Sequence, residues 1–210
     1  MQKKGKFIAL EGIDGSGKST QVSLLCHRLK AEGHQVYPTF EPTNGPIGSL
    51  IRQMFSRRIV GDDKTIAALF VADRLDHLQN PVNGLLKKLE EGYTVITDRY
   101  YFSSYAYHGA HMPLEWVIQS NALSAELLRP DLNIYIDISP EVGLQRVHAN
   151  RADIEIYETQ ENIKKVHATY LKAFELLQNE ERITKVDGNR PPAAIAEDIY
   201  AIAHALMVEV

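Results

Sequence analysis

The sequence has little of what disulfide-bonded, membrane-spanning and nucleic-acid-binding proteins require. Its single cysteine, Cys26, excludes an intrachain disulfide and a metal site built from several cysteines, and it suits a reducing, cytoplasmic setting. No apolar run approaches the ~18 residues of a membrane span, and the run after the basic start is too short for a signal peptide. The net charge is −4 and basic residues form no block, so we expect neither a membrane nor a nucleic acid as a partner. Positive charge for an anionic ligand must therefore be gathered locally.

Length and patterning predict one α/β domain over residues 1–210. The 210 residues, 44% of them hydrophobic, suffice for one core. Short β-branched runs alternate with amphipathic stretches, which is typical of βα units around a parallel sheet. We predict a three-layer sandwich in which helices flank a five-stranded parallel sheet. The predicted strands are Phe7–Leu10, Val36–Phe40, Tyr93–Thr97, Asn133–Ile138 and Ile183–Val186.

Helices fit between these strands, and some carry clear end signals. Gly92 is a usual C-terminal stop, and Ser139 offers a capping hydroxyl before a proline in the first helical position. The predicted helices are Lys18 to just before Gly33, Pro46 to Arg58, Thr65 to Leu78, Pro81 to Glu91, and one that begins at Ser139-Pro140.

The segment Gly12-Ile13-Asp14-Gly15-Ser16-Gly17-Lys18-Ser19 matches the pattern G-x-x-x-x-G-K-[ST] of a phosphate-binding loop. It lies between a predicted strand and a predicted helix, where backbone N–H groups and the helix N-terminus can surround a triphosphate. Lys18 can reach the β- and γ-phosphates, and the Ser19 hydroxyl can ligate Mg²⁺. We therefore expect Mg²⁺ with ATP, bound by the residues from Gly12 to Thr20.

A phosphate loop alone leaves GTPases, motors, metabolic kinases and passive nucleotide binders open. Thr184-Lys185-Val186-Asp187 has the T-K-x-D form with which GTPases recognise guanine, but the sequence contains no D-x-x-G switch segment outside the phosphate loop. We interpret these four residues as a strand that ends in a turn.

Two residue pairs are candidates for the other half of the site. Asp98-Arg99 ends a predicted strand at the carboxyl edge of the sheet, where α/β folds bind ligands. There Asp98 can hold Mg²⁺, and Arg99 can grip phosphate oxygens with a bidentate fork. Phe70 and Arg74 lie one helical turn apart, so the ring could stack on a base while the guanidinium donates to a base carbonyl. Taken alone, Phe70 is better explained as a core residue, and Arg74 as a solvated side chain or one paired with Asp73 or Asp76.

Five collinear blocks resemble the thymidylate kinase family, and they cover nearly the whole chain. They are Leu10–Gln21, Glu41-Pro42-Thr43 through Arg52, Leu69–Arg74 with His77, Asp98-Arg99-Tyr100 through Tyr107, and Pro130-Asp131-Leu132 with Pro140–Gly143 and Arg146. The resemblance implies a fold of the phosphate-loop kinase type, transfer of the γ-phosphoryl group of Mg·ATP to dTMP, and a homodimer.

The resemblance also assigns roles in the acceptor site. Asp14 would contact the deoxyribose 3′-hydroxyl or belong to the loop that positions it. Arg52 and Arg99 would hold the acceptor phosphate. Tyr107 would crowd the position of a ribose 2′-hydroxyl. The loop near Asp187-Gly188-Asn189 would lie against adenine.

For the base, the resemblance implies that Phe70 stacks on thymine and that Arg74 and Ser104 recognise its polar edge. His108 stands where many members have Gln, and Phe40 stands where many have Arg. Asn44-Gly45 also differs from the glycine-rich turn that is usual in the family at this place. The expected substrate-binding residues are Asp14, Glu41, Arg52, Phe70, Arg74, Arg99, Ser104, Tyr107 and His108.

A mobile lid is predicted at about 147–160, because Ala149–Asp153 interrupts the apolar periodicity. The family's Asp-Arg-x-Glu pattern is replaced there by Glu155-Ile156-Tyr157-Glu158. The resemblance points to a lid arginine that neutralises transition-state charge. We favour Arg151, which lies on the irregular segment, over Arg146, which lies in a predicted helix. An exposed ion pair is the alternative for Arg151.

An acceptor that is itself a phosphate, with a second pKa of about 6, needs no general base. Catalysis then rests on aligning two anions and neutralising their repulsion, for which we expect Lys18, Asp98, Arg99 and Arg151. Three alternatives stay open. The chain could phosphorylate another nucleoside monophosphate, or a deoxynucleoside with Glu11 or Glu41 as base, or it could bind nucleotide without turnover.

Overall fold

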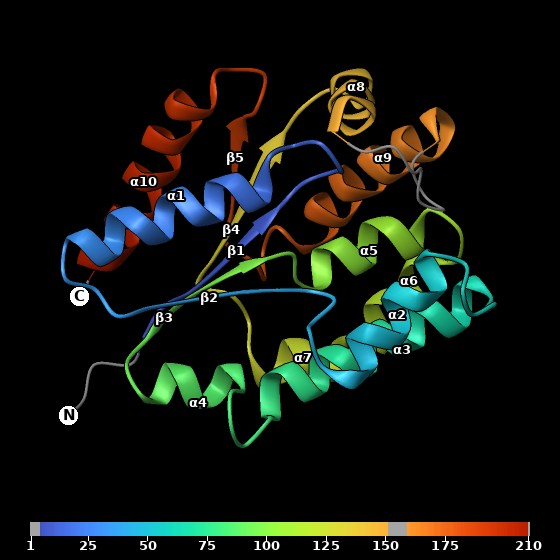
Figure 1. Ribbon diagram of the computed structural model, residues 1–210, viewed down its shortest axis with the longest axis horizontal. Helices are drawn as coiled ribbons and strands as arrows, with labels where there is room; N and C mark the ends of the chain where they lie inside the picture. Colours follow the sequence, from blue (N-terminus) through green and yellow to red (C-terminus); the bar gives the residue numbers. More distant parts are fainter. Residues whose placement is uncertain (1–4, 151–158, 210) are drawn as a thin grey trace.

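The candidate site is positioned by a five-stranded parallel sheet with helices on both faces, as predicted (Figure 1). The computed structural model describes residues 5–150 and 159–209. The strand order is β2-β3-β1-β4-β5. From β1 the chain runs to the edge strand β2, returns to β3 beside β1, and then crosses to β4 and β5 on the other side of β1. The carboxyl end of β1 is therefore the switch point where α/β sheets bind ligands. The strands are β1 (Phe7–Glu11), β2 (Val36–Phe40), β3 (Thr94–Asp98), β4 (Leu132–Asp137) and β5 (Ile183–Asp187).

Burial along the strands follows their place in the sheet. Every residue of the central strand β1 is buried, whereas exposure alternates along the edge strand β2. Pro38, which has no N–H to donate, lies in this edge strand. The continuous apolar runs in the sequence thus mark the strands that are covered on both faces.

Helices α1 and α10 cover one face of the sheet, and helices that include α4, α5 and α9 cover the other (Figure 1). Val22 and Leu25 of α1 pack with Ile195 and Ile199 of α10 on the first face. No helix in the described part of the chain is long and apolar enough to cross a membrane. The helices are α1 (Lys18–Ala31), α2 (Pro46–Phe55), α3 (Asp63–Gln79), α4 (Leu85–Glu90), α5 (Tyr101–Gly109), α6 (Leu114–Ser120), α7 (Ala122–Leu127), α8 (Pro140–Asn150), α9 (Gln160–Leu177) and α10 (Pro192–Val208).

Two predicted helix ends were wrong, each for a local reason. Helix α4 begins at Leu85 and not at Pro81, because Asn80 holds a turn in which its Oδ1 accepts from the N–H groups of Val82 and Asn83. Helix α2 ends at Phe55 and not at Arg58. Beyond it Arg57 has φ 57°, which a continuing helix does not allow.

The predicted start of α8 is confirmed. Ser139 Oγ accepts from the N–H of Val142 at 3.3 Å, and Pro140 is the first helical residue. This start lies just beyond the carboxyl end of β4, on the same edge of the sheet as the phosphate loop.

Candidate active site

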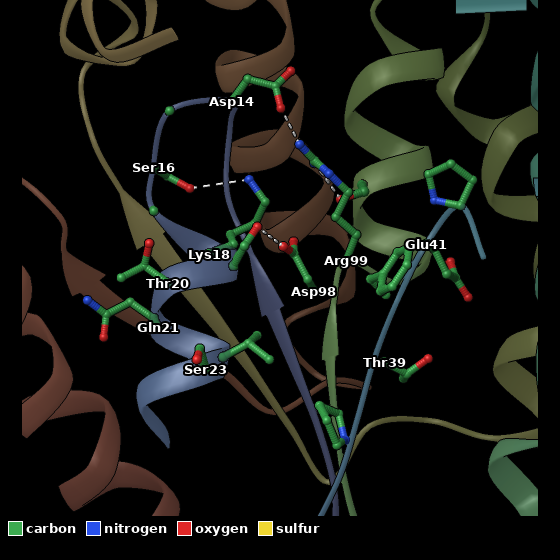
Figure 2. A pocket seen from close by; sticks show the side chains of 18 of the residues that line it. Asp14, Ser16, Lys18, Thr20, Gln21, Ser23, Thr39, Glu41, Asp98 and Arg99 are labelled. Atoms are coloured by element: carbon green, nitrogen blue, oxygen red, sulfur yellow. Dashed lines mark hydrogen bonds and ion pairs between the residues drawn. The ribbon is translucent and has the colours of Figure 1, made fainter. Parts of the chain in front are cut away.

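The loop between β1 and α1 folds around the side chain of Lys18 (Figure 2). Lys18 Nζ donates to the carbonyl of Ile13 at 3.0 Å and to Ser16 Oγ at 3.4 Å. Gly15 has φ 79°, and a Cβ there would lie 2.3 Å from the carbonyl oxygen of Gly143. Glycine is therefore required at this position by both backbone conformation and space. The result is a tight loop at the N-terminus of α1, the arrangement that binds phosphate in this motif.

Lys18 is 6% exposed, and this burial affects its charge. Burial, together with the positive charge of Arg99, lowers the pKa of Lys18 to about 8. An anion that binds beside the ammonium group would oppose both effects. The loop therefore favours a polyanionic ligand.

Ser19 and Asp98 meet across the sheet edge, although they are far apart in the sequence. Ser19 Oγ donates to Asp98 Oδ2 at 2.5 Å. The other carboxylate oxygen, Asp98 Oδ1, is buried and has no hydrogen-bond partner among the described residues. A hydroxyl beside a carboxylate that has one unpartnered oxygen fits a hydrated Mg²⁺ ion. Most ligands of such an ion are water and phosphate oxygens, so it needs few ligands from the protein.

Arg99 joins the end of β3 to the phosphate loop. It has φ 76°, a left-handed conformation that is uncommon outside glycine. Its Nη2 pairs with Asp14 Oδ1, and its Nη1 donates to Ser103 Oγ at 3.0 Å. Tyr107 completes the group, because its hydroxyl accepts from the N–H of Asp14 at 3.0 Å. Arg99, Asp14 and Tyr107 thus lie together, whereas Arg52, the other arginine expected at the acceptor phosphate, donates to the carbonyls of Pro42 and Thr43.

A cavity of about 1350 Å³ opens at this edge of the sheet. Sites for one small ligand usually measure roughly 300–1,000 Å³, so this volume suits two ligands side by side. Most of the expected site residues line it: Asp14, Gly15, Ser16, Gly17, Lys18, Ser19, Thr20, Glu41, Arg52, Phe70, Asp98, Arg99, Ser104, Tyr107 and His108.

The end of the cavity beyond Arg99 has an aromatic wall. The Phe70 ring lies 6.0 Å from the Phe55 ring and 5.2 Å from the His108 ring, measured between centroids. Burial, followed by the charge of Arg74, lowers the pKa of His108 to about 3, so the imidazole is neutral. An uncharged aromatic wall of this kind suits a nucleobase, which can stack on one of its rings.

Arg74 lies behind this wall and is not among the described residues that line the cavity. Its Nε and Nη2 donate to Glu41 Oε2 at 2.9 and 2.6 Å, and its Nη1 donates to Asn121 Oδ1. Nη2 also lies 3.1 Å from Ser104 Oγ, and Ser104 lines the cavity. Arg74 therefore has an ion-pair partner that the sequence analysis did not consider, and direct recognition of a base by Arg74 stays a prediction.

Of the two candidate lid arginines, the structure describes only Arg146. Arg151 lies outside the described residues, as does most of the predicted lid. Arg146 lines the cavity, and its Nη2 and Nη1 donate to the carbonyls of Gly188 and Gly15 at 3.1 and 3.4 Å. Arg146 thus connects α8 to the phosphate loop and to the turn after β5.

The sequence analysis missed the support beneath Arg99. Glu11 is buried and accepts from the N–H of Tyr100 at 2.8 Å, from Ser103 Oγ at 2.6 Å and from the Tyr170 hydroxyl at 3.0 Å. Burial raises the pKa of Glu11. A glutamate directly before the phosphate loop was the available signal, but Tyr170 on α9 could not be found from spacing.

The T-K-x-D segment lies within β5 and is followed by a turn, as interpreted from the sequence. Asp187 Oδ1 accepts from the N–H and the side-chain amide of Asn189, both at 2.9 Å. The Asp187 carboxylate thus holds its own turn together.

Comparisons with known proteins all find the same family. A family model described as "Thymidylate kinase" matches residues 10–199. The chain is 37% identical over 202 residues to "Probable thymidylate kinase" of Pyrobaculum calidifontis, covering 96% of this chain and 97% of that protein. It is 40% identical over 179 residues to "Probable thymidylate kinase" of Pyrococcus horikoshii, covering 82% and 84%. It is 34% identical over 206 residues to "Thymidylate kinase" of Shouchella clausii, covering 93% of each.

Proposed function

We propose that this chain, which belongs to the thymidylate kinase family, transfers the γ-phosphoryl group of ATP to dTMP and releases dTDP and ADP. The observation that carries the proposal is the contact between Arg99 and the phosphate loop. Arg99 pairs with Asp14 while Lys18 lies in the same loop, and all three line one cavity. Two groups suited to two different phosphates are therefore adjacent, as in-line transfer between two anions requires.

The acceptor phosphate is a dianion at neutral pH and needs no base. Catalysis consists of holding donor and acceptor in line and neutralising their charge, which we assign to Lys18, Arg99 and Arg52 and to a cation from the lid. The aromatic wall at Phe70 would hold the base and exclude water from that end of the cavity.

We assign Mg²⁺ to Ser19 and Asp98. The spare buried oxygen of Asp98 beside the Ser19 hydroxyl supports this assignment. When bound with ATP, the cation would supply charge neutralisation at the transferred phosphoryl group. The two side chains would orient it through the hydroxyl and the carboxylate.

Phosphorylation of a deoxynucleoside is the weaker alternative, because it needs a base for the hydroxyl proton. The two carboxylates proposed for that role are both engaged. Glu11 accepts three hydrogen bonds, and Glu41 is paired with Arg74 and His77.

We further propose a homodimer in the cytoplasm. The family resemblance supports the dimer, and the single, buried, free thiol of Cys26 fits a reducing compartment. Light scattering on the purified protein at several concentrations tests the oligomeric state.

ADP release tests the reaction. ATP and Mg²⁺ are supplied with dTMP, dUMP, UMP, dCMP or thymidine in turn, and ADP is followed by a coupled assay. We expect the highest kcat/KM with dTMP and loss of activity when Mg²⁺ is chelated. ADP release at the same rate with every acceptor and with none would refute the kinase function, and turnover of thymidine alone would favour the deoxynucleoside kinase.

A further inference from the structure

One side of α3 is polar and buried, and it faces the segment that ends β2. Arg74 and His77 are 1% and 7% exposed. Arg74 donates to Glu41 Oε2, and His77 Nδ1 lies 3.1 Å from Glu41 Oε1. His77 Nε2 lies 2.7 Å from Thr39 Oγ1. Helix α3 therefore holds the end of β2 at two successive points.

A third point of attachment is Asp73, which is 1% exposed. Its Oδ2 accepts from the N–H of Thr43 and its Oδ1 accepts from Thr43 Oγ1, both at 2.7 Å. Thr43 Oγ1 in turn accepts from the N–H of Gly45 at 3.1 Å. Both oxygens of one buried carboxylate are thus used on one residue of the loop, in charge-assisted hydrogen bonds.

The carbonyl oxygen of the same Thr43 anchors an arginine. Arg52 Nη1 donates to the carbonyls of Thr43 at 2.6 Å and Pro42 at 2.9 Å, and Arg52 Nη2 donates to Ser49 Oγ at 3.2 Å. Helix α2 comes so close that a Cβ at Gly48 would lie 2.0 Å from the Thr43 carbonyl oxygen. Contacts therefore run without interruption from Asp73 through Thr43 to Arg52.

Phe70 lies on α3 one turn before Asp73, and both Phe70 and Arg52 line the cavity. We propose that Asp73 is a positioning residue that ties Arg52 to the helix that carries Phe70, so that the phosphate and the base of the acceptor are held in one fixed relation. This inference rests on the proposed function. Asp73 is buried and is not among the described residues that line the cavity, so we assign its effect to fixing the carbonyl to which Arg52 is bound.

The Asp73→Asn variant tests the idea without changing side-chain size. An amide offers one acceptor where the carboxylate offers two, so its oxygen can keep the N–H of Thr43 only if its NH₂ faces the Thr43 hydroxyl. The hydroxyl can accept from that NH₂, but its own hydrogen then loses the carboxylate, and both contacts lose the negative charge that strengthened them. Asp76→Asn is the matched control, because Asp76 is exposed on the same helix. Thr43→Val removes the hydroxyl and with it the contacts to Asp73 Oδ1 and to the N–H of Gly45, but it keeps the backbone N–H that reaches Asp73 Oδ2; Thr43→Ser restores the hydroxyl. For each variant we would measure kcat, the KM values for dTMP and ATP, and Tm.

We expect Asp73→Asn to raise the KM for dTMP by about tenfold or more while the KM for ATP stays within about twofold. Thr43→Val should act in the same direction, and Thr43→Ser and Asp76→Asn should resemble wild type. Unchanged dTMP kinetics in both Asp73→Asn and Thr43→Val would overturn the inference. Equal losses for ATP and dTMP together with a lower Tm would also overturn it, since they would show a structural role only.

Thr43→Val decides the outcome if Asp73→Asn does not fold. The proposed function is tested separately in the same assay. Wild-type protein that forms no ADP in response to dTMP would refute the function, whereas active wild type with unaffected variants would refute only the role of Asp73.

Discussion

Removal of the Arg74 side chain should lower the thermal stability of the protein markedly. The side chains of Arg74 and Glu41 are 1% and 2% exposed, with Nη2 and Oε2 2.6 Å apart. In Arg74→Ala the Glu41 carboxylate stays buried with His77 beside it but without its guanidinium partner. Breaking a buried ion pair from one side costs about 3–5 kcal/mol. For a domain of this size that corresponds to a Tm lowered by roughly 6–20 °C.

The assay is thermal unfolding by circular dichroism for wild type, Arg74→Ala and the double variant Glu41→Gln/Arg74→Met. The double variant leaves no unpaired charge and fills more of the space, so it should recover part of the lost stability. A Tm for Arg74→Ala within about 2 °C of wild type, combined with a raised KM for dTMP, would refute the buried-pair reasoning. It would favour direct recognition of the base by Arg74.

The pH dependence gives an independent check. Burial raises the pKa of Glu41, but Arg74 and His77 outweigh burial and hold it below the ordinary value of 4.5. A carboxylate whose pKa is lowered in the folded state stabilises the protein above its unfolded pKa, and that contribution is lost as the pH falls through the folded value. The contribution of the lowered Glu41 pKa to wild-type stability is therefore full above pH 4.5 and is lost below it, and the Tm difference between wild type and Arg74→Ala should be smaller at acidic than at neutral pH. A difference that does not change with pH would refute the electrostatic cause.

Three further predictions concern the cavity. Because the pKa of Lys18 in the free protein is about 8, the Kd for ATP should rise about fivefold between pH 8 and 9, whereas Lys18→Arg should bind ATP with little change over that range. Tyr107→Ala should narrow the ratio of kcat/KM between dTMP and its ribonucleotide, and Tyr107→Phe, which keeps the ring, should not; equal ratios in all three proteins would place sugar selectivity elsewhere. Arg151→Ala should lower kcat by about 10³ with small changes in substrate binding. A large loss in Arg146→Ala alone would transfer that role, and small losses in both would exclude a lid arginine.

The sequence alone was sufficient to predict the features that depend on residues close together in the chain. The phosphate loop is one contiguous segment whose glycines and flanking strand and helix specify its conformation, and Lys18 and Ser19 follow directly from it. The five strands were found to within one residue at every end, because buried parallel strands are continuous apolar runs. Helix ends were less certain, since α4 depends on a side-chain turn at Asn80 that composition does not reveal.

The pairing between distant segments was decided by tertiary structure. Arg74 was expected to pair with a neighbouring aspartate or to meet a base, but packing of α3 against the end of β2 gives it Glu41, 33 residues away. Asp98 and Ser19 are separated by 79 residues, and Tyr170 and Glu11 by 159. The sequence supplies the charged and polar groups and the edge of the sheet where they emerge. Which of them meet depends on how the helices pack, because a buried charge is stable only where packing brings it a partner.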